Sequence, residues 1–203
     1  MFKKQLGLIF GFVFIDLLGY SLILPLLPYY ADQFGASLTL IGLLGTANAL
    51  GQLVAAPIIG RLSDRYGRRP LLIVSISGTV FGFLMLGLAN SLWMLFLSRI
   101  LDGFLGGNIT LAQAYITDVT DNKERAKGLG LIGAAFGLGF IIGPAMGGTL
   151  AGDGNYALPA LIASGLAFLN LLGVFFWLPE SLPPEERERQ AREIGRASCR
   201  ERV

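Results

Sequence analysis

The sequence predicts an all-α protein, a polytopic membrane bundle of six transmembrane helices. Hydrophobic residues make up 53% of the 203 residues, and the mean hydropathy of +0.62 is too high for a soluble domain of this size. The apolar residues gather in six runs, each long enough to cross a bilayer, which takes about 20 helical residues. The basic residues gather in alternate connections between these runs.

The six expected spans contain almost no charge. Four of them have no charged residue, the first holds only Asp16, and the fourth holds Arg99 and Asp102. Backbone N–H and C=O groups in lipid must be paired within their own segment, so we expect helices rather than strands. The spans are expected, in chain order, at 6–31, 36–60, 70–90, 91–117, 128–152 and 154–179.

Lysine and arginine distinguish the two sides of the membrane. The connections around 32–35, 89–91 and 151–156 contain neither residue, whereas the other connections and both flanks are basic. Because basic loops stay in the cytoplasm, both termini are expected there. The chain is therefore expected to be a multi-pass protein of the cell membrane with an even number of spans.

Several classes of function are excluded by composition. The sequence has no histidine and one cysteine, Cys199, which rules out a histidine metal site and an internal disulfide. No nucleophile–base set is visible, so we expect neither an enzyme nor a cofactor or metal, and the net charge of +2 indicates no nucleic acid. The segment 128–133 matches the dinucleotide pattern G-x-G-x-x-G, but a charged loop precedes it where a strand is needed.

The connection between the second and third spans reads GRLSDRYGRR from Gly60 to Arg69 and is followed by Pro70. Gly60 and Gly67 would allow the backbone to bend, and Pro70 suits the first turn of a helix. The arginines would face the anionic inner leaflet, with Asp64 neutralising one of them. By itself this pattern indicates a basic cytoplasmic turn.

The same pattern resembles the signature loop between helices 2 and 3 of the major facilitator superfamily. The fixed positions of that signature, G-x-x-x-D-R-x-G-R-R, are occupied by Gly60, Asp64, Arg65, Gly67, Arg68 and Arg69. The resemblance implies a transporter whose first half consists of two inverted three-helix repeats. It also implies that Asp64 and Arg68 stabilise one end state of alternating access, with Asp118 as their acidic partner.

The fifth span carries a glycine pattern. Gly139, Gly143 and Gly147 are four residues apart, so they share one helix face and would let another helix approach closely. Pro144 would favour a bend. A general packing role explains these residues, but with Gly148 they also form G-x-x-x-G-P-x-x-G-G, which is similar to the signature of the antiporter branches. That similarity implies export coupled to protons, with the proton as coupling ion.

The three charges within the spans are expected near mid-membrane. Asp16 lies about 15 Å into its helix and Asp102 about 16 Å past Ser91, in a core about 30 Å thick. Arg99 and Asp102 are three residues apart and share a face. Charges at this depth should face the bundle interior or a wet cavity. A structural ion pair would account for Arg99 and Asp102 but would leave Asp16 unexplained.

Further resemblance lies in the first and fourth spans. The runs at 16–19 (DLLG) and 25–28 (PLLP) look like the first helix of the tetracycline and multidrug proton antiporters. Arg99, followed four residues later by Gly103, is similar to a family motif associated with proton transfer. The resemblance implies that Asp16, Arg99 and Asp102 line the central cavity. Four uncharged polar residues could contact substrate or join helices by hydrogen bonds: Asn48, Gln52, Asn108 and Gln113.

The expected organisation is a transmembrane domain at 1–184, the start of a cytoplasmic linker at 185–193, and a tail at 194–203 that resembles vector-derived sequence. Members of the family have twelve or more spans, so a second six-helix half is expected as a partner. The other expected partners are the lipid bilayer and a small-molecule substrate. The function implied is export of drugs or small metabolites in exchange for protons. A sugar or metabolite symporter and a non-transporting six-helix scaffold remain alternatives, although a scaffold has no need of Asp16 and Asp102.

Overall fold

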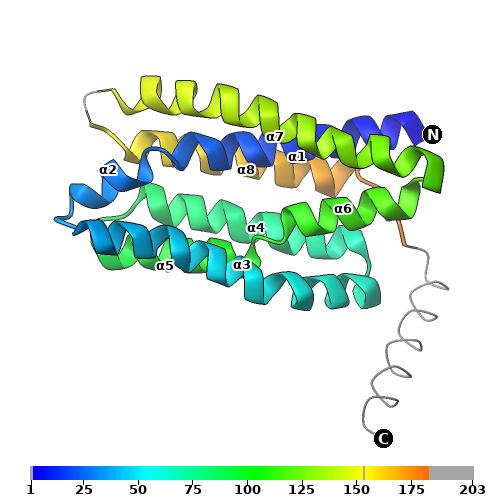
Figure 1. Cartoon of the computed structure of the whole chain (residues 1–203), viewed down its shortest axis with the longest axis horizontal. Coiled ribbons are helices and arrows are strands. Elements are labelled where there is room, and N and C mark those ends of the chain that lie inside the picture. Colours follow the sequence, from blue (N-terminus) through cyan, green and yellow to red (C-terminus); the bar gives the residue numbers. More distant parts are fainter. Residues whose placement is uncertain (1, 153, 183–203) are drawn as a thin grey trace, which may run out of the picture.

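The structure is a computed structural model that describes residues 2–152 and 154–182. The expected linker at 185–193 and tail at 194–203 lie outside the described residues. The described part is all-helical (Figure 1). Its helices are α1 (Phe2–Ile23), α2 (Leu27–Asp32), α3 (Leu38–Tyr66), α4 (Arg68–Gly87), α5 (Leu92–Leu105), α6 (Asn108–Val119), α7 (Asn122–Ala151) and α8 (Ala157–Trp177).

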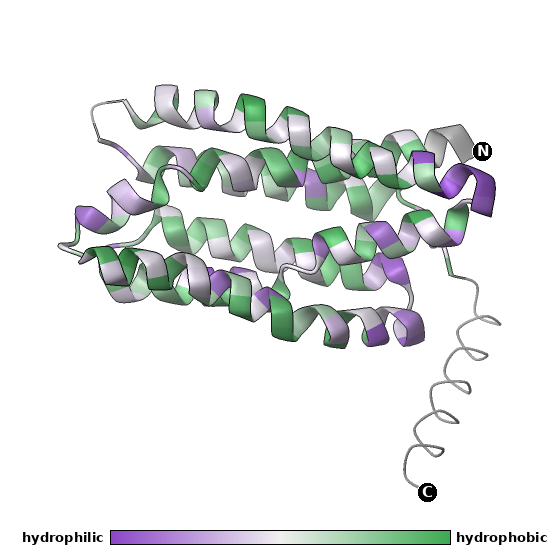
Figure 2. Cartoon of the chain, in the orientation of Figure 1, coloured by the Kyte–Doolittle hydropathy of each residue, from purple (hydrophilic) through white to green (hydrophobic). Residues whose placement is uncertain are grey.

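The bundle has the expected membrane character. Among the described residues, α1, α3, α4, α7 and α8 are long and apolar enough to cross a bilayer. The fourth span is made by α5 and α6 together, with 14 and 12 residues. Apolar residues cover the length of the helices (Figure 2), and many large ones are exposed, as lipid contact requires.

Two of the expected continuous helices are interrupted. The first span stops at Ile23 and resumes as α2 at Leu27, after a turn that contains Pro25, a residue with no N–H to donate. The fourth span breaks at Gly106 and Gly107, between α5 and α6. A glycine pair is a common cause of such a break because it bends at little steric cost.

The turn between the second and third spans is shorter than expected. Helix α3 continues to Tyr66, so Gly60 lies inside a helix and the expectation that it bends the chain is wrong. Helix α3 can continue past Gly60 because arginine side chains extend to water from the end of a membrane helix. Gly67 makes the reversal, with φ 105° and ψ 157°, a conformation that L side chains rarely adopt. Helix α7 likewise begins earlier than expected, at Asn122.

The helix pairs reflect an internal repeat. Helix α1 packs along α7, α3 along α5, and α4 along α8. The first span thus pairs with the fifth, the second with the fourth, and the third with the sixth. This set of pairs is unchanged when the first three spans are exchanged with the last three, as two three-helix repeats require.

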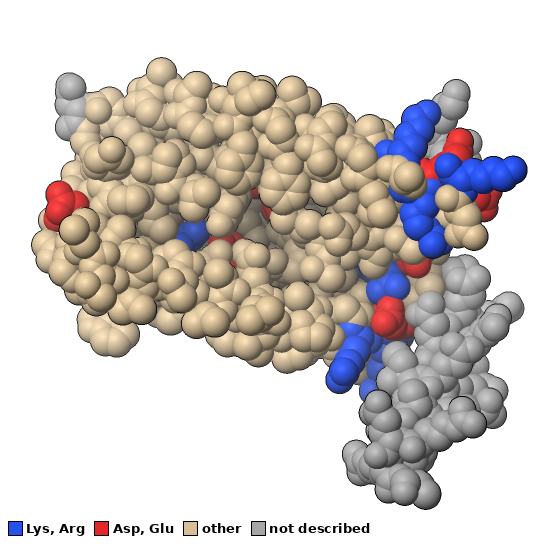
Figure 3. Space-filling view, in the orientation of Figure 1, with Lys and Arg blue, Asp and Glu red and all other residues tan. Residues whose placement is uncertain are grey.

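The basic residues lie at one end of the bundle. Figure 3 shows lysine and arginine gathered around the turns that join α3 to α4 and α6 to α7, the end where the amino terminus also lies in Figure 1. We call this the basic end. The opposite end of the visible face carries acidic but no basic side chains, which agrees with the alternation of charge in the sequence.

Candidate functional site

A cavity opens near the middle of the bundle. Its volume is about 290 Å³, and Figure 3 shows acidic and basic atoms at the bottom of a hollow in this face. The carboxylates of Asp16 and Asp102 belong to its lining. So do apolar and aromatic side chains, among them Tyr20, Phe83 and Phe136. Charged groups at mid-depth therefore face this cavity and the bundle interior.

Asp102 is held by residues of two helices. Its Oδ2 lies 3.5 Å from Arg99 Nη1 and accepts a hydrogen bond of 3.1 Å from Asn48 Nδ2. Asn48 also donates to the carbonyl oxygen of Arg99 at 3.1 Å, and Gln52 Nε2 donates to Asn48 Oδ1 at 3.1 Å. The side chain of Asn48 thus joins α3 to α5 at the ion pair.

The surroundings of Arg99 are mostly apolar. Arg99 is 3% exposed, and its guanidinium lies 5.5 Å from the centre of the Phe83 ring. Among the described residues nothing accepts a hydrogen bond from its Nε or Nη2. Arg99 and Asn48 also line a second, smaller cavity of about 20 Å³, while Asp102 lines the larger one. The Arg99–Asp102 pair thus lies between two hollows.

Asp16 is positioned by the break in the fourth span. Asn108 is the first residue of α6, and its Nδ2 donates to Asp16 Oδ1 at 2.7 Å and to Thr79 Oγ1 at 3.1 Å. Gly106 and Gly107 line the cavity beside it. An uninterrupted helix would present a different face at Asn108, so the glycine pair decides which side chain reaches Asp16.

The structure therefore brings together most of the polar residues expected at the centre. Asp16, Asp102, Gln52 and Asn108 line the larger cavity, and Asn48 and Arg99 lie directly behind it. Gln113 is exposed and is not among the residues that line this cavity. Thr79 was missed by sequence reasoning, because one hydroxyl in an apolar run gives no distinctive signal.

The glycines of α7 provide the close contact with α1. A Cβ at Gly139 would lie 3.3 Å from the Cβ of Leu17, and one at Gly143 would overlap the hydroxyl of Ser21. One at Gly147 would overlap the carbonyl oxygen of Leu22. Gly148 points into open space, so it does not belong to this contact. Pro144 lies within α7, and Ser21 Oγ donates to the carbonyl oxygen of Gly139 at 2.8 Å.

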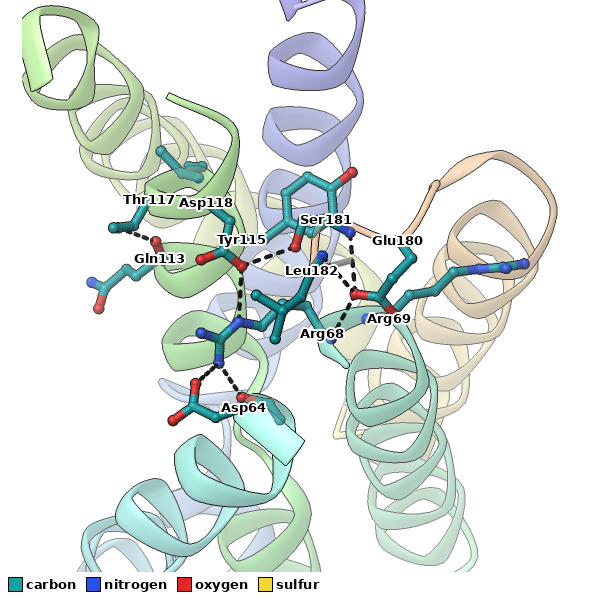
Figure 4. Close-up of polar contacts among 12 residues, drawn as sticks. Asp64, Arg68, Arg69, Gln113, Tyr115, Thr117, Asp118, Glu180, Ser181 and Leu182 are labelled. Carbon is teal, nitrogen blue, oxygen red and sulfur yellow. Dashed lines mark hydrogen bonds and ion pairs between the residues drawn. The ribbon is translucent and has the colours of Figure 1, made fainter. Parts of the chain in front are cut away.

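A second polar cluster lies at the basic end (Figure 4). The Arg68 guanidinium bridges two helices, with Nη1 2.6 Å from Asp64 Oδ1 and Nε 3.0 Å from Asp118 Oδ2. It also donates to the hydroxyl of Ser63. The expected trio of Asp64, Arg68 and Asp118 is thus in contact and links the ends of α3, α4 and α6. We call these three residues the switch cluster, after the role that the resemblance implies for Asp64 and Arg68.

The remaining signature arginines lie at the edge of this cluster. Arg65 has its guanidinium 5.5 Å from the ring of Tyr66. Arg69 Nη2 donates to the carbonyl oxygen of Phe175 at the end of α8, and its guanidinium lies 6.0 Å from the Phe175 ring. Arg69 therefore ties the third span to the sixth.

Sequence reasoning missed the acidic residue that joins this cluster from the far end of the chain. The Glu180 carboxylate accepts hydrogen bonds from the backbone N–H groups of Arg68 at 2.8 Å and Arg69 at 3.2 Å. Ser181 Oγ donates to Asp118 Oδ2 at 3.0 Å. The available signal was the pair Glu180 and Ser181, an acidic and a hydroxyl residue directly after Pro179 at the end of the last span. On the sequence alone this pair belongs to the transmembrane domain and has no distinct role.

Comparison with known proteins agrees with this geometry. The family model described as Major Facilitator Superfamily matches residues 9–202. The class B tetracycline resistance protein of Escherichia coli is 39% identical over 184 residues, which cover 89% of this chain and 45% of that protein. Multidrug resistance protein 2 of Bacillus subtilis (strain 168) is 38% identical over 176 residues, which cover 86% and 44%. The chain spans about half the length of the curated relatives it matches.

Solved structures have the same arrangement of helices. The crystal structure of the human organic anion transporter MFSD10 superposes with a TM-score of 0.83 at 28% identity, covering 92% of this chain and 50% of that one. The match of the family model to nearly the whole chain, together with the six-span repeat and the switch cluster, leads to one conclusion: the chain belongs to the Major Facilitator Superfamily of membrane transporters.

Proposed function

We propose that this chain forms the amino-terminal half of a proton-coupled antiporter that exports small molecules by alternating access. The observation that carries the proposal is the cavity of about 290 Å³ with two carboxylates, Asp16 and Asp102, in its lining. Ionisable residues at mid-membrane are costly and are characteristic of ion and substrate pathways. The relatives named for tetracycline and multidrug resistance support export as the direction.

Asp16 is the proposed site of proton exchange. Arg99 lies against Asp102 and Asn48, whereas Asp16 contacts the neutral amide of Asn108. Among the residues that the structure describes, Asp102 has a cationic partner and Asp16 has none. Asp16 can therefore gain or lose a proton without breaking an ion pair, whereas the same change at Asp102 would disrupt its pairing with Arg99.

The cavity chemistry fits an amphiphilic substrate. Phe83, Phe136 and Tyr20 offer aromatic surface, and Gln52 and Thr79 offer hydrogen bonds beside the carboxylates. A substrate that donates to Asp16 would compete with a proton for the same oxygen atoms. Binding of the proton on one side of the membrane would then favour release of the substrate there, which is the sequence of events in antiport.

Transport by a reconstituted two-half protein tests the proposal. This chain would be joined to the carboxy-terminal half of the class B tetracycline resistance protein, and tetracycline uptake measured in inverted membrane vesicles that are acidic inside. We expect uptake that disappears when the pH gradient is dissipated. We also expect Asp16→Asn to abolish gradient-driven uptake, because the amide cannot exchange a proton.

Asp32→Asn is the matched control, since Asp32 is an exposed carboxylate at the end of α2. This variant should transport normally. If Asp16→Asn transports with an undiminished dependence on the gradient, Asp16 is not the coupling residue. Uptake that requires vesicles acidic outside would instead indicate symport.

A further inference from the structure

The chain does not leave the bundle when its last span ends. After α8, residues 179–182 cross the basic end and contact α4 and α6 (Figure 4). Tyr115 of α6 donates its hydroxyl to the carbonyl oxygen of Pro179 at 3.0 Å. Leu182 is buried, at 1% exposed. We call residues 179–182 the strap.

The carboxylate of Glu180 occupies the amino-terminal end of α4. Its Oε1 accepts from Arg68 N and its Oε2 from Arg69 N, while Oε1 also accepts from the strap's own Ser181 N and Leu182 N. The first N–H groups of a helix have no partner within the helix. A negative charge at that end is favourable as well. Glu180 therefore binds α4 through two backbone groups and folds the strap through two others.

Arg68 belongs to the strap contact and to the switch cluster at once. Its N–H is held by Glu180, and its side chain lies between Asp64 and Asp118. The residue before it, Gly67, has no side chain with which to fix the turn. Asp118 is shared too, because its Oδ2 accepts from both Arg68 Nε and Ser181 Oγ. The strap and the switch cluster thus meet at two residues.

We propose that Glu180 is a positioning residue of the switch, and that the strap fastens the exit of the last span to the turn between α3 and α4. Rearrangement of the switch cluster then requires release of the strap, because Arg68 and Asp118 belong to both sets of contacts. These contacts lie at the basic end, away from the cavity, and depend neither on the substrate nor on Asp16.

Hydrogen exchange of the whole chain in nanodiscs, followed by mass spectrometry, tests the contact. Glu180→Ala removes both acceptors from the first amides of α4, and Glu180→Gln keeps one acceptor oxygen. We expect exchange at residues 68–69 to be slowest in the parent protein, intermediate in Glu180→Gln and about ten-fold or more faster in Glu180→Ala. Glu124→Ala is the control, because Glu124 lies in the first turn of α7 at the same end.

A double-mutant comparison separates positioning from simple anchoring. Glu180→Ala, Arg68→Gln and the double variant would be compared by their thermal unfolding midpoints in detergent. If Glu180 positions Arg68, the double variant loses clearly less than the sum of the two single losses. Additive losses, or exchange at residues 68–69 that is equal in Glu180→Ala and Glu124→Ala, would overturn the proposal. Glu180→Gln supplies the exchange comparison if Glu180→Ala does not fold.

Discussion

The contact between α1 and α7 makes a sharp prediction for Gly143→Ala. A Cβ at this position would overlap Ser21 Oγ and lie 2.9 Å from Leu22 N, which is backbone and cannot rotate away. Overpacking of this kind costs roughly 1–3 kcal/mol. Displacing Ser21 also threatens its hydrogen bond to the Gly139 carbonyl oxygen, worth about 1 kcal/mol. The expected total is therefore about 2–4 kcal/mol.

Gly137→Ala is the matched control for this change. Gly137 lies on the same helix, but a Cβ there would meet nothing within 4 Å. Both variants gain the helix propensity of alanine, and Gly143→Ala also places a Cβ directly before Pro144, so the difference combines the overlap with α1 and the clash with the proline ring. At about 2–4 °C per kcal/mol for a chain of this size, Gly143→Ala should unfold roughly 4–16 °C below Gly137→Ala.

The assay is thermal unfolding of the purified chain in one detergent, followed by circular dichroism. Midpoints of both variants that equal that of the parent protein would refute the close α1–α7 contact. Equal losses in the two variants would refute the assignment of the two faces of α7.

The remaining predictions concern the turn between α3 and α4. Gly67→Ala should lower the unfolding midpoint, because a φ of 105° strains any residue with a Cβ by about 1–3 kcal/mol. Gly60→Ala adds a methyl group in open space within α3 and should leave the unfolding midpoint unchanged or raise it. An equal fall of the midpoint in Gly67→Ala and Gly60→Ala would contradict the assigned turn. Arg68→Gln should lower the midpoint more than Arg61→Gln, because Arg68 joins Asp64 and Asp118 whereas Arg61 is exposed. Equal midpoints would show that the bridge adds nothing to stability.

Hydropathy was sufficient to locate the six spans but not the interruptions in two of them. Gly106 and Gly107 lie in a run whose neighbours are apolar, and a membrane helix often accepts glycine without breaking. The break follows from tertiary packing: Asn48 of α3 fits against Gly103 of α5, and Asn108 turns toward Asp16. Such a choice depends on neighbours that are distant in sequence.

The candidate site was predictable where residue type and depth sufficed. Asp16, Arg99 and Asp102 were identified because charge is rare in a span, and Asp64, Arg68 and Asp118 because their pattern resembles a known signature. Glu180 could not be found in this way, since an acidic residue beyond the last span is common. Its importance comes from meeting the backbone N–H groups of α4, which carry no sequence signal.

The broken fourth span has a consequence for what must fill the centre of the protein. Where α5 ends and α6 begins, the Ser75 hydroxyl donates a hydrogen bond to the carbonyl oxygen of Leu105. The first amides of α6, at Asn108, Ile109 and Thr110, have no acceptor among the described residues, and these three residues border the cavity. Hydrocarbon cannot accept hydrogen bonds from such amides, so they need a polar partner, such as water, in the cavity. A purely hydrocarbon molecule in this cavity would leave these N–H groups without an acceptor, so the shape of the main chain favours an occupant that can accept hydrogen bonds.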